Sequence, residues 1–416
     1  MINLATVYNV FIRDFRKQKK RITLTLIALG WGTISIVLLL AFGEGLQRQM
    51  SINGKGLGEG IAIVWGGQTT IPFKGYGKGR PIWLKKDDVR YLEERVPGLR
   101  YIGGEYHRWG TEIRYGDKVL SEHANGIPPN YEFMRSHIPM QGGRMINDLD
   151  MRLKRRVAYL GHNLKERLFG DEDAVGKQIL VKGIPFTIVG VEIEKMQMSS
   201  YSGQDADKLS LPATTFEAIF GDRYLDNIVY QPERVEDMKA VEKAVYEAMA
   251  AKYTFDPADE RALWVWDVAE SARQFENLMI GLKLFLGIVG GLTLLIAGVG
   301  VANIMYVSIR ERTREIGIKM AVGARRSYIL AQFLIEAIII TFFGGFGGLA
   351  ISYILTEGFK RLPIESEVLD FMGRPTISLD VGAIVVAILG VMGLLSGFFP
   401  ALRAASVNPV ESLRYE

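Results

Sequence analysis

The 416-residue sequence contains no cysteine, only four histidines and a net charge of only +4. The absence of cysteine excludes disulfides, thiolate catalysis and cysteine-ligated metal sites, but it does not identify a compartment, since many exported domains fold without disulfides. The small net charge argues against nucleic-acid binding, so the position of the basic residues matters more than their number. Long apolar stretches occur beside 23% charged residues. This segregation predicts separate membrane and water-exposed regions.

Recognisable catalytic motifs are missing from the long charged region, residues 44–280. No Gly-x-Ser-x-Gly elbow is present. Gly170–Gln178 resembles a phosphate-binding loop, but five residues separate its glycines and Gln178 stands where Ser or Thr would hold magnesium, so we predict a turn. The histidines show no metal-ligand spacing and stand in unrelated local contexts, so we interpret them as solvated or structural; they are His107, His123, His137 and His162. We therefore predict no catalytic residue and no metal site.

Four apolar windows predict four transmembrane helices. About 20 apolar residues, rising about 1.5 Å each, cross a hydrocarbon core of about 30 Å. The helices are assigned to residues 22–43, 281–309, 327–356 and 381–402. The first window also has features of a signal peptide, because basic residues precede it and Ala41-Phe42-Gly43 resembles a cleavage site. Its apolar run is longer than a signal core, so we favour a membrane helix.

The basic residues predict the orientation of these helices. One cluster lies before the first helix, within 13–21, and a second fills the 310–326 loop, whereas the 357–380 loop is balanced by acidic residues. The positive-inside bias places both termini and the 310–326 loop in the cytoplasm. Residues 44–280 and the short 357–380 loop then lie outside. We further expect a cytoplasmic amphipathic helix over 1–21 and a cytoplasmic tail over 403–416.

Small and polar residues mark positions where the membrane helices are expected to touch. Glycines spaced four apart allow close backbone approach in lipid, although glycine is common in membrane helices; the three steps are Gly287/Gly291, Gly344/Gly348 and Gly393/Gly397. Asn303 and Glu336 are polar residues within the spans. A charge inside a membrane is costly and needs a partner. For Glu336 we favour a structural partner, either Asn303 or the Arg310 region, over a proton-relay role.

Residues 44–280 are predicted to form a mixed α/β extracytoplasmic domain, giving a fold class of four transmembrane helices plus this domain. Strand and helix patterns indicate two βαβ halves, about 60–120 and 207–268, flanking an inserted β-rich lobe that contains a hairpin over 178–191. Gly66–Pro81 is glycine-rich and is expected to be a flexible linker. The 195–208 loop contains Met and Tyr, which form adaptable contact surfaces. It is either a contact for a partner or cargo or, as we favour, an ordinary surface loop.

The 310–326 loop contains a short helical pattern. Ile316, Met320 and Gly323 fall at i, i+4 and i+7, giving a narrow apolar face among charged residues, and Gly323 can end the helix. Such a helix is either an interfacial anchor on anionic lipid or a knob that docks into a groove of a cytoplasmic partner.

A family resemblance favours docking. The 310–326 loop, continued by 328–337, resembles MacB/FtsX-like ABC transporter permeases, as do 397–414, 43–45 and 175–179. The resemblance implies mechanotransmission, in which ATP-driven closure of cytoplasmic ATPases is conveyed through the membrane helices to the extracytoplasmic domains. It implies that 312–324 is the coupling helix; the residues expected to couple are Arg312, Arg314, Glu315, Ile316, Gly317, Met320, Gly323 and Ala324.

The resemblance also implies the partners. We expect a separate ABC ATPase subunit, because no nucleotide-binding domain is recognised in the sequence, with ATP and magnesium on that ATPase and no cofactor on this chain. A second permease copy, identical or related, is expected in the bilayer of a bacterial inner membrane, and a periplasmic adaptor stays open.

The expected function is therefore that of a permease subunit, not itself an enzyme, that drives export or efflux of a cargo that the sequence does not name. The alternative is a non-transporting regulator of a cell-wall hydrolase. A membrane-tethered enzyme is disfavoured because residues 44–280 offer no nucleophile, base or metal cluster.

Overall fold

The computed structural model describes residues 19–197, 199–363, 369 and 373–408, which form two compact units. Residues up to Met50 and from Glu276 onward belong to the membrane unit, and Ser51–Phe275 form the α/β unit. Nearly all of the helix predicted over 1–21, and the end of the tail predicted over 403–416, lie outside the described residues.

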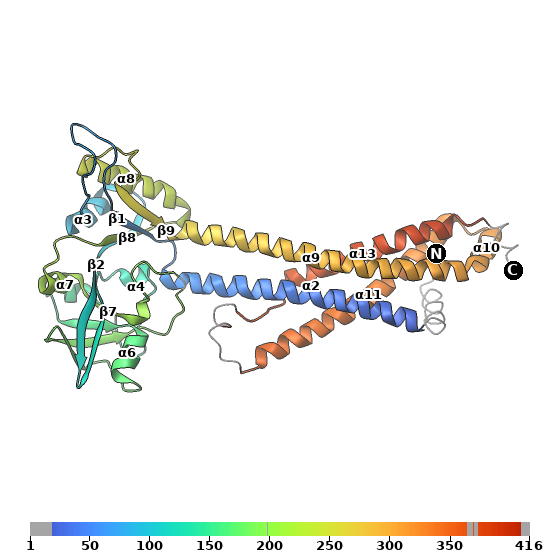
Figure 1. The fold of residues 1–416 in the computed structure, drawn as a ribbon, viewed down its shortest axis with the longest axis horizontal. Helices are drawn as coiled ribbons and strands as arrows, with labels where there is room; N and C mark the ends of the chain where they lie inside the picture. Colours follow the sequence, from blue (N-terminus) through green and yellow to red (C-terminus); the bar gives the residue numbers. More distant parts are fainter. Residues whose placement is uncertain (1–18, 198, 364–368, 370–372, 409–416) are drawn as a thin grey trace. The chain divides into compact units, whose positions relative to one another are not determined.

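Four helices of the described chain are long and apolar enough to cross a membrane, which confirms the predicted number of spans (Figure 1). Each helix is longer than its apolar window because charged or polar residues extend it at the ends. They are α2 (Lys19–Gly54), α9 (Val268–Glu311), α11 (Arg326–Arg361) and α13 (Leu379–Ala405). A short helix, α10 (Thr313–Ala321), lies between α9 and α11, where the sequence predicted one.

Two of the three predicted glycine steps pack against neighbouring helices. A methyl group added at Gly344 would lie 2.8 Å from Leu29 Cβ, and one added at Gly348 would lie 2.5 Å from the Gly30 carbonyl, so α11 and α2 touch at backbone distance. Added methyl groups on the α13 step would meet α11, at Thr341 and Ala337; the glycines are Gly393 and Gly397.

The third step, Gly287/Gly291, was wrongly predicted as a contact within the chain. No described atom lies within 4 Å of a methyl group added at either glycine. The glycine of α9 that does pack is Gly290, where an added methyl group would lie 2.7 Å from Ile36 Cβ of α2. The four-residue spacing of glycines identified the face of α9 that is turned away from the other described helices.

Part of the α/β unit is a four-stranded antiparallel sheet with two helices. In chain order its elements are β1 (Ala62–Gly66), α3 (Lys86–Arg95), the first half of β2 (Leu99–Tyr115), β8 (Asn227–Pro232), α8 (Met238–Tyr253) and β9 (Leu263–Asp267). The order β2-β8-β1-β9 interleaves β1-α3-β2 with β8-α8-β9, which is the ferredoxin-like split βαβ arrangement. We refer to it as the split sheet. It confirms two βαβ halves, but the second begins at β8 and not at residue 207.

The inserted lobe is a closed six-stranded barrel. The second half of β2 pairs with β3 (Lys118–Ile127), and the pairings continue in the order β2-β3-β7-β4-β6-β5 and return to β2. The remaining strands are β4 (Val157–Leu160), β5 (Gln178–Val181), β6 (Ile184–Val191) and β7 (Lys208–Pro212). Alternate residues such as Ile179/Val181 and Leu209/Leu211 are buried in one apolar core, as expected for the inner face of a small barrel. The β5–β6 hairpin was predicted correctly.

Short helices complete the α/β unit. They are α4 (Tyr131–Met134), α5 (Asp148–Arg152), α6 (His162–Phe169) and α7 (Ala213–Phe220), with 3-10 turns η1 (Lys55–Leu57), η2 (Asp205–Asp207) and η3 (Val235–Asp237).

The glycine-rich stretch 66–81 is not the flexible linker that its composition predicted. The Asp259 carboxylate accepts hydrogen bonds from the Thr70 backbone N–H at 2.5 Å, the Thr70 hydroxyl at 2.6 Å and the Ile71 N–H at 3.0 Å. Isolated bridges pair Gln68 with Pro81 and Phe73 with Tyr76. Asp259 lies almost 190 residues away along the chain, so local composition could not indicate this anchor.

Two membrane helices continue directly into adjacent strands of the split sheet. Helix α2 ends at Gly54 and leads through η1 to β1, whereas α9 begins at Val268, immediately after β9. Strands β1 and β9 pair in antiparallel register, and the Val268 N–H donates to the Ile61 carbonyl at 3.1 Å. Helices α2 and α9 are therefore connected to one pair of strands.

Candidate functional site

Helix α10 presents a different face from the one the sequence predicted for docking. Ile316 is only 3% exposed and belongs to the apolar core of the membrane unit, against which Met320 is partly buried. Ile318 is 46% exposed and Val322, which caps the helix, is 85% exposed. The i, i+4 pattern had identified the face that packs inward. The assignment of Ile316 as a docking side chain is therefore wrong, because a core residue is not available to a partner.

The other residues expected to couple divide in the same way. Arg312 and Gly317 are buried, Ala324 is partly buried against the same core, and the exposed members are Arg314, Glu315 and Gly323. Gly323 has φ of 100° just after the last turn of α10. This left-handed conformation suits glycine and confirms that Gly323 ends the helix.

A buried ion pair fixes α10 to α11. The two terminal nitrogens of Arg312 each donate to one carboxylate oxygen of Glu336, both at 3.2 Å. Lys319 Nζ donates to Gln332 Oε1 at 3.1 Å and makes a second connection. This confirms that the partner of Glu336 lies in the Arg310 region, whereas the side chain of Asn303 is exposed on α9. With Ile316 in the core, α10 is attached as a rigid part of the membrane unit.

The other end of the membrane unit is held by the residues around Gly45. Glu44 of α2 forms an ion pair with Lys283 of α9. A methyl group at Gly45 would collide with the Arg374 carbonyl. The Thr376 N–H donates to the Ala41 carbonyl at 3.0 Å, so the segment before α13 is also bound to α2.

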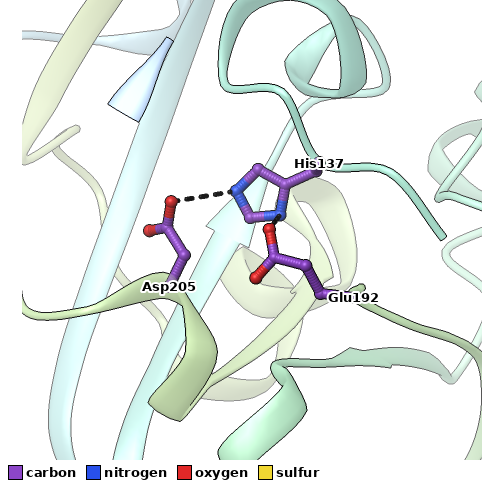
Figure 2. A group of neighbouring side chains, drawn as sticks. All are labelled: His137, Glu192 and Asp205. Atoms are coloured by element: carbon purple, nitrogen blue, oxygen red, sulfur yellow. Dashed lines mark ion pairs between the residues drawn. The ribbon is translucent and has the colours of Figure 1, made fainter. Parts of the chain in front are cut away.

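The α/β unit contains a cluster of buried charged side chains that the sequence did not reveal. Figure 2 shows His137 between two carboxylates, with Nδ1 3.2 Å from Glu192 Oε1 and Nε2 3.5 Å from Asp205 Oδ2. Asp205 also accepts two hydrogen bonds from Arg135, at 2.7 and 2.8 Å, and one from Lys208 at 3.0 Å.

The donor set of this cluster resembles a metal site, but its charges do not fit one. The ligand atoms of His137, Glu192 and Asp205 lie within 4.8 Å of one another. However, the two imidazole nitrogens face different carboxylates, and a single ion binds only one of them. The Lys195 ammonium already contacts the same two oxygens, Glu192 Oε1 at 2.8 Å and Asp205 Oδ2 at 3.2 Å. A lysine side chain therefore takes the position of the cation.

Electrostatics keep the carboxylate of Asp205 ionised. Burial alone would raise its pKa, but the charges of Arg135 and Lys208 hold the pKa well below its usual range. Burial lowers the pKa of Lys208, and Asp205 opposes that effect. The cluster is thus a charged network whose members depend on one another.

The network continues to Glu105 on β2. Its carboxylate accepts hydrogen bonds from the Tyr201 hydroxyl and the Asn227 amide, both at 2.7 Å, and lies 3.0 Å from His107 Nε2. Burial raises the pKa of Glu105, but the hydrogen bond and charge of His107 lower it to about 2. Glu105 is the last β2 residue that pairs with β8, and Tyr106 is the first that pairs with β3. The cluster thus lies where the split sheet meets the barrel.

Two predictions from the sequence are corrected here. The 195–208 loop is not an ordinary surface loop in its second half, because Ser202, Asp205 and Lys208 are buried. The histidines are not in unrelated contexts, since the ring centroids of His107 and His123 lie 5.2 Å apart and His137 joins the Asp205 cluster. Strand pairing, and not local spacing, brings these residues together.

Comparison with known proteins finds a family model that matches each of the two units. A family model described as the MacB-like periplasmic core domain matches residues 22–248, and one described as the FtsX-like permease C-terminal matches residues 287–409. The macrolide export ATP-binding/permease protein MacB of Chromobacterium violaceum is 30% identical over 418 residues, covering 99% of this chain and 61% of that protein. The pyoverdine export ATP-binding/permease protein PvdT of Pseudomonas savastanoi pv. phaseolicola is 30% identical over 406 residues, covering 95% and 57%.

A solved structure is also similar. The periplasmic region of MacB from Actinobacillus actinomycetemcomitans matches with a TM-score of 0.42 and 18% identity, covering 54% of this chain and 95% of that one. The chain spans about three fifths of the length of the curated relatives it matches.

Proposed function

Because the chain belongs to the family with a MacB-like periplasmic core domain and an FtsX-like permease C-terminal region, we propose that it conveys the energy of ATP hydrolysis to cargo by mechanotransmission. In this proposal an ATP-driven movement displaces α10, and the membrane helices carry the displacement to the α/β unit. The observation that carries the proposal is α10 itself. It exposes Ile318 and Val322 while the Arg312–Glu336 pair fixes it to α11.

Partners and orientation follow from the same proposal. The names of the relatives combine ATP-binding and permease functions, which supports an ABC ATPase, with its ATP and magnesium, as the partner of α10. The basic 310–326 loop supports a cytoplasmic position for α10 and for both termini. The unpacked face of α9 with Gly287 and Gly291 supports contact with a second permease copy in the inner membrane. The names of the relatives support export. A periplasmic adaptor is proposed as a further partner from the family resemblance alone.

The docking of α10 is tested by charge. Ile318→Glu/Val322→Glu should abolish co-purification with the ABC ATPase, because two exposed apolar contacts would become carboxylates. A matched control is Val119→Glu/Leu153→Glu, which alters two exposed apolar residues of the α/β unit and should leave co-purification intact. Undiminished ATPase recovery with the α10 variant would overturn the docking proposal. Ile316→Glu is unsuitable because a charge in the core disrupts folding.

Cargo movement separates export from regulation. Reconstituted with its ATPase, the chain should support ATP-dependent release of cargo from the membrane or periplasmic side, with macrolides and pyoverdine as the first compounds to assay. If ATP instead activated a cell-wall hydrolase and no cargo moved, the regulatory alternative would replace export.

A further inference from the structure

The turn that follows α2 is packed at backbone distance against two other segments. A methyl group at Gly56 would collide with the backbone of Met196, and one at Gly58 would collide with the Met134 carbonyl. Gly58 also has φ of 128°, which side chains other than glycine rarely adopt. Any displacement of the end of α2 therefore presses directly on Met134 and Met196.

Both of these residues are neighbours of cations that bind Asp205. Arg135 follows Met134 and binds the Asp205 carboxylate through two hydrogen bonds. Lys195 precedes Met196, and its ammonium contacts Asp205 Oδ2 at 3.2 Å and the Arg135 carbonyl at 3.0 Å. The Asp205 N–H also donates to Gln197 Oε1 at 2.9 Å. The Asp205 carboxylate thus binds the neighbours of both Met134 and Met196, the two residues whose backbones pack against the turn.

The 195–208 loop also reaches the junction between the split sheet and the barrel. Tyr201 donates to Glu105 and lies 3.2 Å from the Tyr131 hydroxyl, oxygen to oxygen. Glu105 stands where β2 passes from β8 to β3. Lys208, which binds Asp205, begins β7 of the barrel. Contacts from the turn after α2 therefore reach both subdomains through charged and hydrogen-bonded groups.

We propose that Asp205 and its three cations, Arg135, Lys195 and Lys208, form a rigid joint that makes the end of α2, the split sheet and the barrel move as one body. The proposal rests on the mechanotransmission proposed above and names the residues that would perform it in the α/β unit. Lys195 is a positioning residue, since it acts by holding Met196 against the turn.

An ionic joint suits this role better than an apolar contact. Apolar surfaces can slide past one another, whereas separating a buried ion pair leaves uncompensated charge in a low-dielectric site. The contacts to Asp205 are also directional, so they specify one arrangement of the three segments. Lys195 is the most accessible member, with its side chain 12% exposed, and is the best single position at which to loosen the joint.

The test uses spin labels in the full chain purified with its ATPase. Because the sequence lacks cysteine, Ile52→Cys at the end of α2 and Asp117→Cys in the β2–β3 turn can be labelled selectively; both positions are exposed. In the native background we expect one narrow distance distribution that ATP does not change. Lys195→Met should lose this single narrow distribution even without nucleotide. The control Lys177→Met removes a barrel lysine that pairs with Glu172 away from the cluster and should retain it.

A second variant keeps every charge in place. Gly56→Ala should broaden the distribution by pushing Met196 away, and it serves as the test if Lys195→Met does not fold. A narrow distribution in the folded variants, matching Lys177→Met, would overturn the joint. This outcome can be told apart from failure of the proposed function. The distance distributions measured without nucleotide test the joint. If the ATPase did not bind α10, and ATP changed no distance between the labels in the variants, mechanotransmission alone would be overturned.

Discussion

The two units contain buried ion pairs of different design. In the membrane unit one base, Arg312, binds the carboxylate of Glu336, 24 residues away along the chain. In the α/β unit a single carboxylate, Asp205, binds Arg135, Lys195 and Lys208, and Arg135 lies 70 residues away along the chain. The first arrangement joins neighbouring elements, and the second joins several distant ones.

The surroundings explain this difference. Within a membrane every unpaired charge is costly, so a neutral pair is the smallest arrangement that allows a charged connection. In the α/β unit Lys195 also contacts Glu192 Oε1 at 2.8 Å and its side chain is 12% exposed, so a second carboxylate and water both offset the positive charge around Asp205. The comparison indicates that the membrane unit needs a local attachment for α10, whereas the α/β unit needs a connection among three segments.

The largest loss of stability is expected from removing the Asp205 carboxylate, which binds three cations. Asp205→Ala should destabilise the α/β unit by about 5 kcal/mol, because it leaves buried cations without their partner. Unfolding in urea can be followed by tryptophan fluorescence, since five of the six tryptophans lie in this unit; they are Trp65, Trp83, Trp109, Trp264 and Trp266.

The control for this prediction is Asp207→Ala, two residues away. Asp207 forms an exposed pair with Arg167, so its loss should change the stability by at most about 0.5 kcal/mol. Equal unfolding midpoints for the two variants would show that the cluster does not stabilise the fold.

A smaller effect is expected in the membrane unit, where one cation, Arg312, loses its contact with Glu336. Glu336→Ala should destabilise the attachment of α10 by about 3 kcal/mol. Trypsin cleavage at the exposed residues Arg325 and Arg326 in mild detergent should then become faster.

The exchanged pair, Arg312→Glu/Glu336→Arg, tests whether the ion pair is the cause. It should recover much of the resistance to trypsin, because opposite charges again face each other. If the exchanged pair were cleaved as fast as Glu336→Ala, some other contact of Glu336 would hold α10.

The sequence predicted the features that depend on neighbouring residues. Four long apolar windows have only one stable environment, so the membrane helices were identified correctly, and so were the β5–β6 hairpin and the existence of α10. The face of α10 was misassigned because an i, i+4 pattern marks any apolar face, whether it packs inward or binds a partner. Ile316 and Ile318 are equally apolar and differ only in what surrounds them.

Features that depend on distant pairing were missed for a physical reason. Glu105, Arg135, Glu192 and Asp205 are spread over about 100 residues and meet only in the folded α/β unit, near the point where the split sheet joins the barrel. Strand β7 was assigned to the wrong half because its parallel partner, β3, lies far away in the sequence. No local spacing distinguishes these residues from ordinary surface charges.

Acid should weaken the α/β unit through Glu105. Its pKa in the folded protein is about 2, lowered by His107 and Arg135 against the opposing effect of burial, whereas in the unfolded chain the ordinary value applies. A lowered pKa stabilises the fold above the unfolded value, so this contribution is lost as the pH falls from about 4.5 towards 2, and it amounts to about 3 kcal/mol.

The variant Glu105→Gln tests whether Glu105 causes the acid sensitivity of the α/β unit. Urea unfolding between pH 6 and pH 3 should show a shallower pH dependence in this variant than in the native chain, since its side chain cannot be protonated. An unchanged slope would assign the acid sensitivity to Asp205 or to other carboxylates.

The smallest expected effect concerns glycine packing, on which the membrane unit depends in addition to its ion pair. Gly348→Ala would place a methyl group 2.5 Å from the Gly30 carbonyl, and the backbones of α11 and α2 would have to separate, at a cost of about 2 kcal/mol. Gly287→Ala meets no described atom within 4 Å and should stabilise α9 slightly, because alanine favours the helix. Thermal unfolding of the two variants in the same detergent compares them directly. If Gly287→Ala were the more damaging variant, its face of α9 would have to be buried against another molecule, and the second permease copy would then contribute to the stability of the membrane unit.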